Sequence, residues 1–149
     1  MISIVSFSYA NQELFKQSYA IRQAVFVVEQ GVPSELEYDE HEAEATHYLL
    51  FYNETPVGAA RWRKTGQGVK LERFAVLPEY RNKGIGDSLV KKVLEDVIPL
   101  KTLIYLHSQL PACNLYKRAG FEIVGEVFYE AGMAHYKMVL RPGNLSSTS

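Results

Sequence analysis

The spacing of apolar residues predicts that the chain begins with a strand and a helix. Apolar and polar residues alternate over residues 1–7, which is the period of a strand with one buried face. Asn11 is a suitable N-cap for a helix over residues 12–28, and Gly31 and Pro33 end that helix. The apolar side chains that recur at helical spacing are those of Leu14, Ile21, Val25 and Val28.

The next segment, residues 34–45, is dominated by carboxylates. A charge run with so few apolar residues predicts a loop or a frayed turn whose side chains are solvated. If the loop bordered a substrate cleft, its charge would favour a cationic substrate instead. The preceding helix carries Arg22, for which a solvated position is one interpretation. The six carboxylates are those of Glu35, Glu37, Asp39, Glu40, Glu42 and Glu44.

Three apolar segments then predict an antiparallel meander. They cover residues 46–52, 57–64 and 69–76, and the polar turns 53–55 and 65–68 separate them. Because such short turns join neighbouring strands, the three segments are expected side by side in one sheet.

The second half of the chain predicts a parallel strand pair and a closing hairpin. An amphipathic helix follows Gly86 and ends at Pro99, and the apolar strand 103–107 comes after it. A strand, helix, strand unit of this kind pairs its strands in parallel. The remaining elements are a helix over 112–119 and a hairpin of strands 121–129 and 134–140.

Together these elements predict a single α/β domain over residues 1–140, followed by a polar tail over residues 141–149. The sheet is expected to be mixed and mostly antiparallel, with six or seven strands flanked by three or four helices. A chain of 149 residues buries enough surface for one core, and no internal repeat suggests a second domain.

Composition argues against several classes of partner. The formal net charge is -1, from 16 basic and 17 acidic residues, so a nucleic-acid surface is not expected. No apolar run approaches the ~18 residues of a membrane span, and the N-terminus lacks the regions of a signal peptide. The single cysteine, Cys113, excludes an intramolecular disulfide and fits a reducing compartment. We therefore expect a cytoplasmic protein without membrane association.

The stretch of residues 71–86 carries the strongest candidate for chemistry. It predicts a strand that ends at Pro78, a basic glycine turn, and a helix whose first-turn N–H groups and dipole stabilise an anion. Gly84 and Gly86 allow positive φ and the close approach of a phosphate. Leu89 stands where a dinucleotide fingerprint has its third glycine, and the Gly-Lys-Ser/Thr of a P-loop is missing.

Two motifs define this anion site more closely. The run Arg81-Asn82-Lys83-Gly84-Ile85-Gly86 follows a strand ending in Phe74-Ala75-Val76 and has the pattern Arg/Gln-x-x-Gly-x-Gly/Ala. Asn114 to Phe121 has the pattern Asn-x-x-Tyr-x-x-x-Gly-Phe. With these motifs in this element order, the chain resembles the GNAT superfamily of acyl-CoA-dependent N-acyltransferases. The features that resemble its ElaA-like branch are Arg22, Val25–Gln30 and Glu35–Asp39.

The resemblance implies a GNAT-like fold, with the sheet splayed in the middle, and acetyl-CoA as co-substrate without a metal. The pantetheine arm would fill the splay by pairing with the strand of Phe74, Ala75 and Val76, as an added strand does. Asn114 matches an asparagine that contacts the cofactor. The residues implied to hold the pyrophosphate are Arg81, Asn82, Lys83, Gly84, Ile85 and Gly86.

The implied reaction is direct transfer of the acetyl group, within a ternary complex, to a primary amine of a small molecule or a peptide. Such a reaction needs a free amine, a polarised thioester carbonyl and a proton for the departing thiolate. Tyr116 matches the tyrosine near the sulfur and is the candidate acid, since a phenol has a reference pKa of about 10. The N–H of Val76 is the candidate oxyanion donor.

Two residues are candidates for the base that deprotonates the amine. Strand alternation places Glu72 on the same face as Phe74, from which it would act through water. The alternative for Glu72 is an ion pair with Arg61 or Arg63. His107 ends the strand that faces the splay and is a candidate relay base. Its alternative is a half-buried histidine bonded to the backbone.

Other functions are a non-catalytic module that binds or senses acyl-CoA and a carrier for longer acyl chains. Asn114 and Tyr116 favour turnover, because binding alone needs no proton donor at the sulfur. His41, Glu42 and His47 lack the His-Glu-x-x-His spacing, so no metal site is expected. The resemblance leaves a homodimer open.

Overall fold

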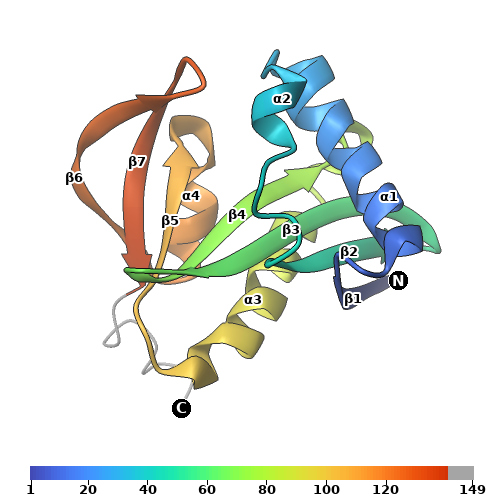
Figure 1. Ribbon diagram of the computed structural model, residues 1–149, viewed down its shortest axis with the longest axis horizontal. Coiled ribbons are helices and arrows are strands. Elements are labelled where there is room, and N and C mark those ends of the chain that lie inside the picture. The colour runs from blue at the N-terminus through green and yellow to red at the C-terminus, as the bar shows by residue number, and fades with distance from the viewer. Residues whose placement is uncertain (141–149) are drawn as a thin grey trace.

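The computed structural model describes residues 1–140, which form one seven-stranded sheet flanked by helices (Figure 1). The strand order is β1-β2-β3-β4-β5-β7-β6, and the β4–β5 pair is parallel whereas the other neighbours are antiparallel. This mixed, mostly antiparallel α/β arrangement confirms the predicted fold class. The predicted tail over residues 141–149 lies outside the described residues. Within residues 1–140 no helix is long and apolar enough to cross a membrane.

The predicted elements occur in the predicted order, with small differences at their ends. The strands are β1 (Ile2–Ser8), β2 (Thr46–Tyr52), β3 (Thr55–Thr65), β4 (Gly68–Val76), β5 (Ile104–Gln109), β6 (Phe121–Glu130) and β7 (Met133–Leu140). The α-helices are α1 (Gln12–Arg22), α2 (Ser34–Glu37), α3 (Ile85–Val97) and α4 (Cys113–Arg118). The shorter segments are the π-helical η1 (Gln23–Glu29) and the 3₁₀ turns η2 (Pro78–Tyr80), η3 (Ile98–Leu100) and η4 (Leu110–Ala112).

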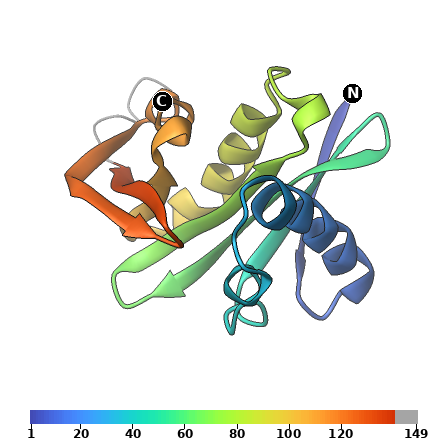
Figure 2. The ribbon, with the colours of Figure 1, turned by 90° about the horizontal axis from the view of Figure 1, so that it is seen from above.

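Helices α1 and α3 cover opposite faces of the sheet (Figure 2). The larger part of the core lies under α3, where Leu89 and Val93 pack on the strands and on Tyr116 of α4. The smaller part lies under α1, where Phe15 and Ile21 are buried against the sheet. The apolar stripe of each helix is thereby removed from water, which is the main stabilising contribution in a domain of this kind.

Helix α1 continues into the π-helical segment η1, which contains the β-branched run that was expected to weaken the helix end. The wider turns of a π-helix change the direction of the following side chains. Val25 remains buried, but Val28 is 79% exposed. The prediction that Val28 belongs to the buried stripe is therefore wrong, because it assumed 3.6 residues per turn throughout.

The sheet is splayed between β4 and β5. Their parallel pairing covers three rungs, from Val69 opposite Ile104 to Leu71 opposite Leu106. Beyond Leu71, β4 continues beside β3, whereas β5 continues beside β7. The two parts of the sheet then diverge (Figures 1 and 2). The splay that the resemblance implied is present.

A β-bulge interrupts β4 next to this splay. Its pairing register with β3 shifts between the pairs made by Glu72 and by Ala75. Arg73 lies in the bulge with a φ of 59°, in the left-handed region. An extra residue in a strand reverses the face on which the following side chains lie. Glu72 and Phe74 therefore lie on opposite faces, and their predicted common face is wrong.

Candidate functional site

A cleft of about 930 Å³ opens where β4 and β5 diverge. Its lining comes from both strands, from η1 and α2, from the starts of α3 and α4, and from the tip of the β6–β7 hairpin. Lys83 and Asn114 are exposed and do not line it. The sequence-predicted residues that line the cleft are Glu72, Phe74, Ala75, Val76, Arg81, Asn82, Gly84, Ile85, Gly86, His107 and Tyr116.

The start of α3 forms one end of the cleft. Gly84 is the N-cap, with a φ of 76°, and Asn82 before it also has a positive φ of 63°. The N–H of Ser88 donates to the Gly84 carbonyl and begins the helical ladder. The N–H groups of residues 85–87 therefore precede the ladder and are available to an anion. Gly86 lies within the helix, so only Gly84 uses the positive φ that was expected for both glycines.

Arg81 does not present a free guanidinium at this end of the cleft. Two of its nitrogens pair with the two carboxylate oxygens of Glu29, each at 2.7 Å, and its Nε donates to the Val76 carbonyl at 3.0 Å. Hydrogen bonding to Arg81 lowers the pKa of Glu29. The cation that the motif was expected to offer to a phosphate is thus held by a carboxylate from η1.

The free edge of β4 runs along the floor of the cleft. The N–H of Leu77 donates to Val57 of β3 at 3.0 Å. Because backbone groups alternate in direction along a strand, those of Phe74 and Val76 point to the opposite edge, into the splay. The Ala75 side chain is buried under α1. Since the Val76 carbonyl already accepts from the Arg81 Nε, the groups that this edge has available for an extended ligand are those of Phe74 and the N–H of Val76.

Tyr116 lies beside this edge, on the α3 face of the sheet. Its ring makes edge-to-face contacts with Phe74, at 5.7 Å between centroids, and with Phe121, at 6.1 Å. Burial raises the pKa of the Tyr116 phenol above its ordinary value, and the neighbouring Cys113 adds to the rise. The phenol therefore holds its proton at neutral pH, which is the state that a proton donor needs.

Glu72 is an ion-pair partner of three cations. One carboxylate oxygen is 2.9 Å from the Arg61 Nε and 3.0 Å from the Arg63 Nε, and the other is 3.3 Å from the Lys70 Nζ. Burial would raise the pKa of Glu72, but the charge of Arg61, followed by those of Lys70 and Arg63, outweighs burial and lowers the pKa to about 2. A carboxylate stabilised in this way has little affinity for a proton at neutral pH.

The acidic segment of residues 34–45 is solvated only in part, whereas the sequence predicted solvated side chains throughout. Glu37 and Glu42 are each 2% exposed and bind the equally buried Arg22, at 2.5 and 2.6 Å. Asp39 binds Arg61 at 2.7 Å. The solvated positions expected for Arg22, Glu37, Asp39 and Glu42 are wrong, because arginines from α1 and β3 pair with these carboxylates. The side chains of Glu35, Glu40 and Glu44 are exposed, as predicted. Arg73, from the bulge of β4, adds a further cation at 3.1 Å from Asp39.

His107 lies one residue beyond the last β4–β5 rung, where the splay begins. Its Nδ1 is 3.1 Å from Glu130 Oε2, so its partner is a carboxylate and not the backbone as the alternative prediction had it. Phe128 packs edge-on against the imidazole, at 5.0 Å between centroids. A second histidine, His135, has its Nε2 3.9 Å from Glu130 Oε1. The imidazole of His107 thus borders the cleft, and its contacts with Glu130 and Phe128 connect it to the β6–β7 hairpin.

Comparison with known proteins identifies the family. A sequence profile of the acetyltransferase (GNAT) domain matches residues 8–142. This chain belongs to the GNAT acetyltransferase family. The uncharacterised N-acetyltransferase YjcF of Bacillus subtilis (strain 168) is 40% identical over 133 residues, which cover 87% of this GNAT chain and 94% of YjcF. The predicted family and enzyme class are thereby confirmed.

Solved structures of other GNAT proteins share the fold. Escherichia coli ElaA has a TM-score of 0.83 and 28% identity, over 95% of this GNAT chain and 100% of the ElaA chain. A GNAT family acetyltransferase from Elizabethkingia anophelis, solved with acetyl-CoA bound, has a TM-score of 0.62 and 17% identity, over 93% and 94% of the two chains. The second likeness concerns the fold alone.

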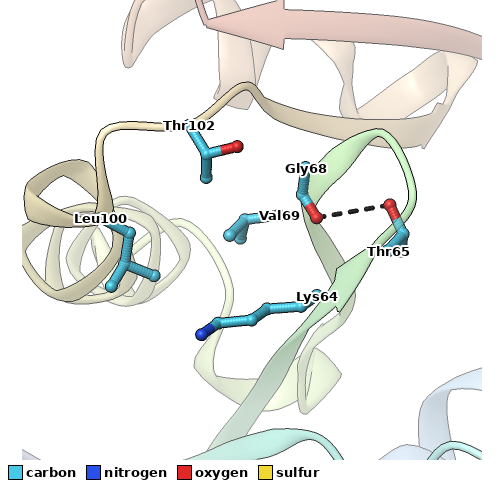
Figure 3. A pocket seen from close by; sticks show the side chains of 6 residues that line it. All are labelled: Lys64, Thr65, Gly68, Val69, Leu100 and Thr102. Carbon is cyan, nitrogen blue, oxygen red and sulfur yellow. Dashed lines mark hydrogen bonds between the residues drawn. The ribbon is translucent and has the colours of Figure 1, made fainter.

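A smaller hollow of about 270 Å³ lies at the other end of β4, beside the segment that follows α3 (Figure 3). Among the described residues, Lys64 is the one ionisable residue that lines it, and the hydroxyl of Thr65 donates to the Gly68 carbonyl at its edge. None of the predicted site residues borders this hollow. Within residues 1–140 no group of three or more His, Cys, Asp or Glu side chains is arranged to hold a metal ion. The splayed cleft is therefore the candidate site of this GNAT acetyltransferase.

Three charged residues in or next to the cleft of this GNAT chain were missed from the sequence, of which Glu29 lies outside the cleft lining. Glu29 binds Arg81, and Glu130 binds His107. Arg73 binds Asp39 of the acidic segment. Each partner is 23 or more residues away in the chain, so no local spacing predicts the contact. The turn around Ala131 and Gly132 was the one available signal for Glu130, because it placed this residue at the tip of a hairpin.

Proposed function

We propose that this GNAT acetyltransferase moves the acetyl group of acetyl-CoA to a primary amine of a small molecule or peptide, by direct transfer in a ternary complex. The supporting observation is that one continuous cleft contains the free N–H groups of α3, the open edge of β4, Tyr116 and His107. A phosphate site, a site for an extended arm, a proton donor and a proton acceptor are thus available in a single space.

The residues of the cleft fit acetyl-CoA as a substrate. The N–H groups at residues 85–87 suit the pyrophosphate, and the lack of a side chain at Gly84 leaves open space there. The backbone groups of Phe74 and the N–H of Val76 suit the amides of the pantetheine arm. Bound acetyl-CoA supplies the thioester.

The proton transfers are assigned to two side chains. His107 takes a proton from the acceptor ammonium, and the resulting free amine attacks the thioester carbonyl. The C–N bond forms and the C–S bond breaks, while Tyr116 gives its proton to the thiolate. The surplus proton of the amide nitrogen returns to Tyr116 through solvent. Glu72 is not assigned as the base, because three cations hold its carboxylate.

Direct transfer is supported by the position of Cys113. It is the single cysteine of the chain, is buried, and does not line the cleft. A covalent acetyl-cysteine intermediate would need a thiolate beside the thioester. Initial rates measured at varied concentrations of both substrates should therefore give intersecting and not parallel double-reciprocal lines.

We expect that the acidic residues of the cleft do not by themselves determine which acceptor amine binds. Of the acidic residues that line the cleft, Glu37 and Asp39 are neutralised by arginines, and the Glu40 side chain is 84% exposed. Replacing Glu40 with glutamine should change the KM of a cationic amine less than about threefold, because exposed charges interact weakly. A tenfold rise would restore the acidic segment as the determinant of acceptor choice.

The decisive experiment is a screen of amines with acetyl-CoA in which release of the free thiol is followed. Tyr116→Phe should lower kcat about 10²-fold without a large change in the affinity for acetyl-CoA, because it removes only the proton donor. The matched control is Tyr129→Phe, since Tyr129 is 71% exposed and outside the cleft lining.

Three outcomes would contradict parts of this proposal. Turnover that is unchanged in Tyr116→Phe removes the assigned acid. Binding of acetyl-CoA without turnover of any amine favours the non-catalytic binding module. Calorimetry that detects no binding at millimolar acetyl-CoA refutes the proposed function as a whole.

A further inference from the structure

We propose that Glu130 is a positioning residue that holds the imidazole of His107 in the tautomer able to accept a proton from the acceptor amine. The inference rests on the proposed function, in which His107 is the base. It adds a residue from the closing hairpin to a site otherwise built from β4, β5, α3 and α4.

The contact between the two side chains has a defined direction. Glu130 Oε2 lies 3.1 Å from the Nδ1 of His107. An ionised carboxylate can only accept a hydrogen bond, so the hydrogen of the neutral imidazole must be on Nδ1. Its Nε2 then carries the lone pair. Within residues 1–140 no hydrogen-bond partner occupies Nε2, and His107 lines the cleft with a side chain that is 24% exposed.

The carboxylate of Glu130 is ionised in this setting. The hydrogen bond from His107 is the largest influence on the pKa of Glu130 and lowers it, and the charge of Lys70 acts in the same direction. Glu130 itself is about half exposed, so water can solvate its second oxygen. The acceptor-only form is therefore the form present at neutral pH.

The hairpin fixes where this carboxylate lies. Glu130 is the last residue of β6, and Ala131 and Gly132 form the turn with φ of 50° and 77°. Phe128 packs against His107 on one side and stacks on His135 on the other, at 5.8 Å between centroids. These side-chain contacts connect the end of β6 to His107 of β5, although β7 lies between the two strands, and they leave the carboxylate beside the imidazole.

Other charged groups near His107 have partners of their own. Lys137 lies opposite His107 on β7, but its ammonium binds Gln67 at 2.8 Å and lies over the ring of Tyr105. Glu72 and Lys70 on β4 pair with each other at 3.3 Å. His135 on β7 has its Nδ1 bound to the Met133 carbonyl at 2.8 Å. Among the described residues, Glu130 is thus the carboxylate that bonds to His107.

The first test reads the tautomer and does not depend on activity. In the full-length protein with nitrogen-15-labelled histidine, two-bond hydrogen–nitrogen correlations distinguish the two neutral tautomers, and His107→Gln identifies the signal. The wild type should show hydrogen on Nδ1. Glu130→Ala should lose this preference, and Glu130→Gln should retain much of it, because an amide oxygen also accepts a hydrogen bond.

The second test is kinetic. Glu130→Ala should lower kcat about 10- to 100-fold, which is less than the 10²- to 10⁴-fold effect expected for His107→Gln. The KM for acetyl-CoA should stay within about twofold, since Glu130 is not among the groups assigned to the cofactor. The double variant should be no slower than His107→Gln alone, because Glu130 acts only through His107.

The matched control is Glu126→Ala, an exposed glutamate on the same strand outside the cleft lining. It should keep the wild-type tautomer and kcat. An unchanged tautomer in Glu130→Ala, or an unchanged kcat where His107→Gln is slow, would overturn the positioning role. If the wild type turns over no amine, the proposed function fails, and the tautomer spectrum still decides whether Glu130 holds the imidazole.

Discussion

The two walls of the cleft hold their carboxylates in opposite ways. On the wall made by β4 and the α1–α2 segment, Glu72 is 9% exposed and is held by Arg61, Arg63 and Lys70. On the wall made by β5, β7 and β6, the Glu130 side chain is 45% exposed and its nearest partner is His107. Both carboxylates border the same cleft, yet their electrostatic environments differ.

This difference shows that position beside a cleft does not make a carboxylate a base. A base needs a pKa near the working pH, and several close cations move a carboxylate away from that range. We therefore expect the β4 wall to stabilise the fold, since its charges pair with one another. The hairpin wall has few ion pairs, and there a carboxylate can act on the proton of a neighbouring imidazole.

The largest effect on stability is expected from the loss of Arg61. Its side chain is 0% exposed and contacts Asp39, Glu42 and Glu72 at 2.7 to 2.9 Å. Arg61→Met should lower the free energy of unfolding by about 3–5 kcal/mol, because it removes the buried cation that these three carboxylates share. Urea denaturation followed by circular dichroism measures this change.

The control for that change is Arg118→Met. Arg118 makes an exposed ion pair with Asp87 at 3.2 Å, so its loss should cost less than about 1 kcal/mol. If the two variants lose equally little stability, the charged cluster does not provide the stabilisation expected of the β4 wall.

A smaller loss of stability is expected when Glu72 is replaced, and it can be compared directly with the replacement of Glu130. Glu72→Gln should cost about 2–3 kcal/mol of unfolding free energy at pH 7, whereas Glu130→Gln should cost less than about 1 kcal/mol. The pKa of Glu72 is about 2 in the folded state against 4.5 ordinarily. The stabilisation is thus complete above about pH 4.5 and is lost as the pH falls toward 2.

Urea denaturation of the wild type and of Glu72→Gln at a series of pH values checks this dependence. The difference between their unfolding free energies should shrink between pH 5 and pH 3. A constant difference over that range would mean that the low pKa of Glu72 does not stabilise the fold, and the contrast between the two walls would weaken.

The smallest expected effect concerns the pair of Glu29 and Arg81 at the phosphate end. Glu29→Gln should change stability by less than about 0.5 kcal/mol, because the pair is partly exposed. It should also tighten acetyl-CoA binding about two- to fivefold, since Arg81 becomes free to meet a phosphate. Titration calorimetry measures the affinity, and Glu79→Gln serves as the control on the neighbouring turn. Weaker binding would show that the ion pair orders the site instead.

Much of the fold was predictable because its signals are local. Alternation over β1, the capping Asn11 before α1 and the turn at Gly84 each depend on residues close in the chain. Val28 was misplaced where a local irregularity, the π-helical turn, changed the period. Glu72 was misplaced for the same kind of reason, because the bulge at Arg73 reversed the alternation on which its predicted face depended.

By itself, the sequence determined the order of elements, the glycine turn before α3 and the family, since strand and helix periods and the two motifs are contained in short segments. Only the tertiary structure decided the roles of the charged side chains. Pairing partners such as Arg61 with Asp39, Arg81 with Glu29 and His107 with Glu130 lie 22 to 52 residues apart. Which charges meet, and how much water they lose, depends on how the folded chain brings these segments together.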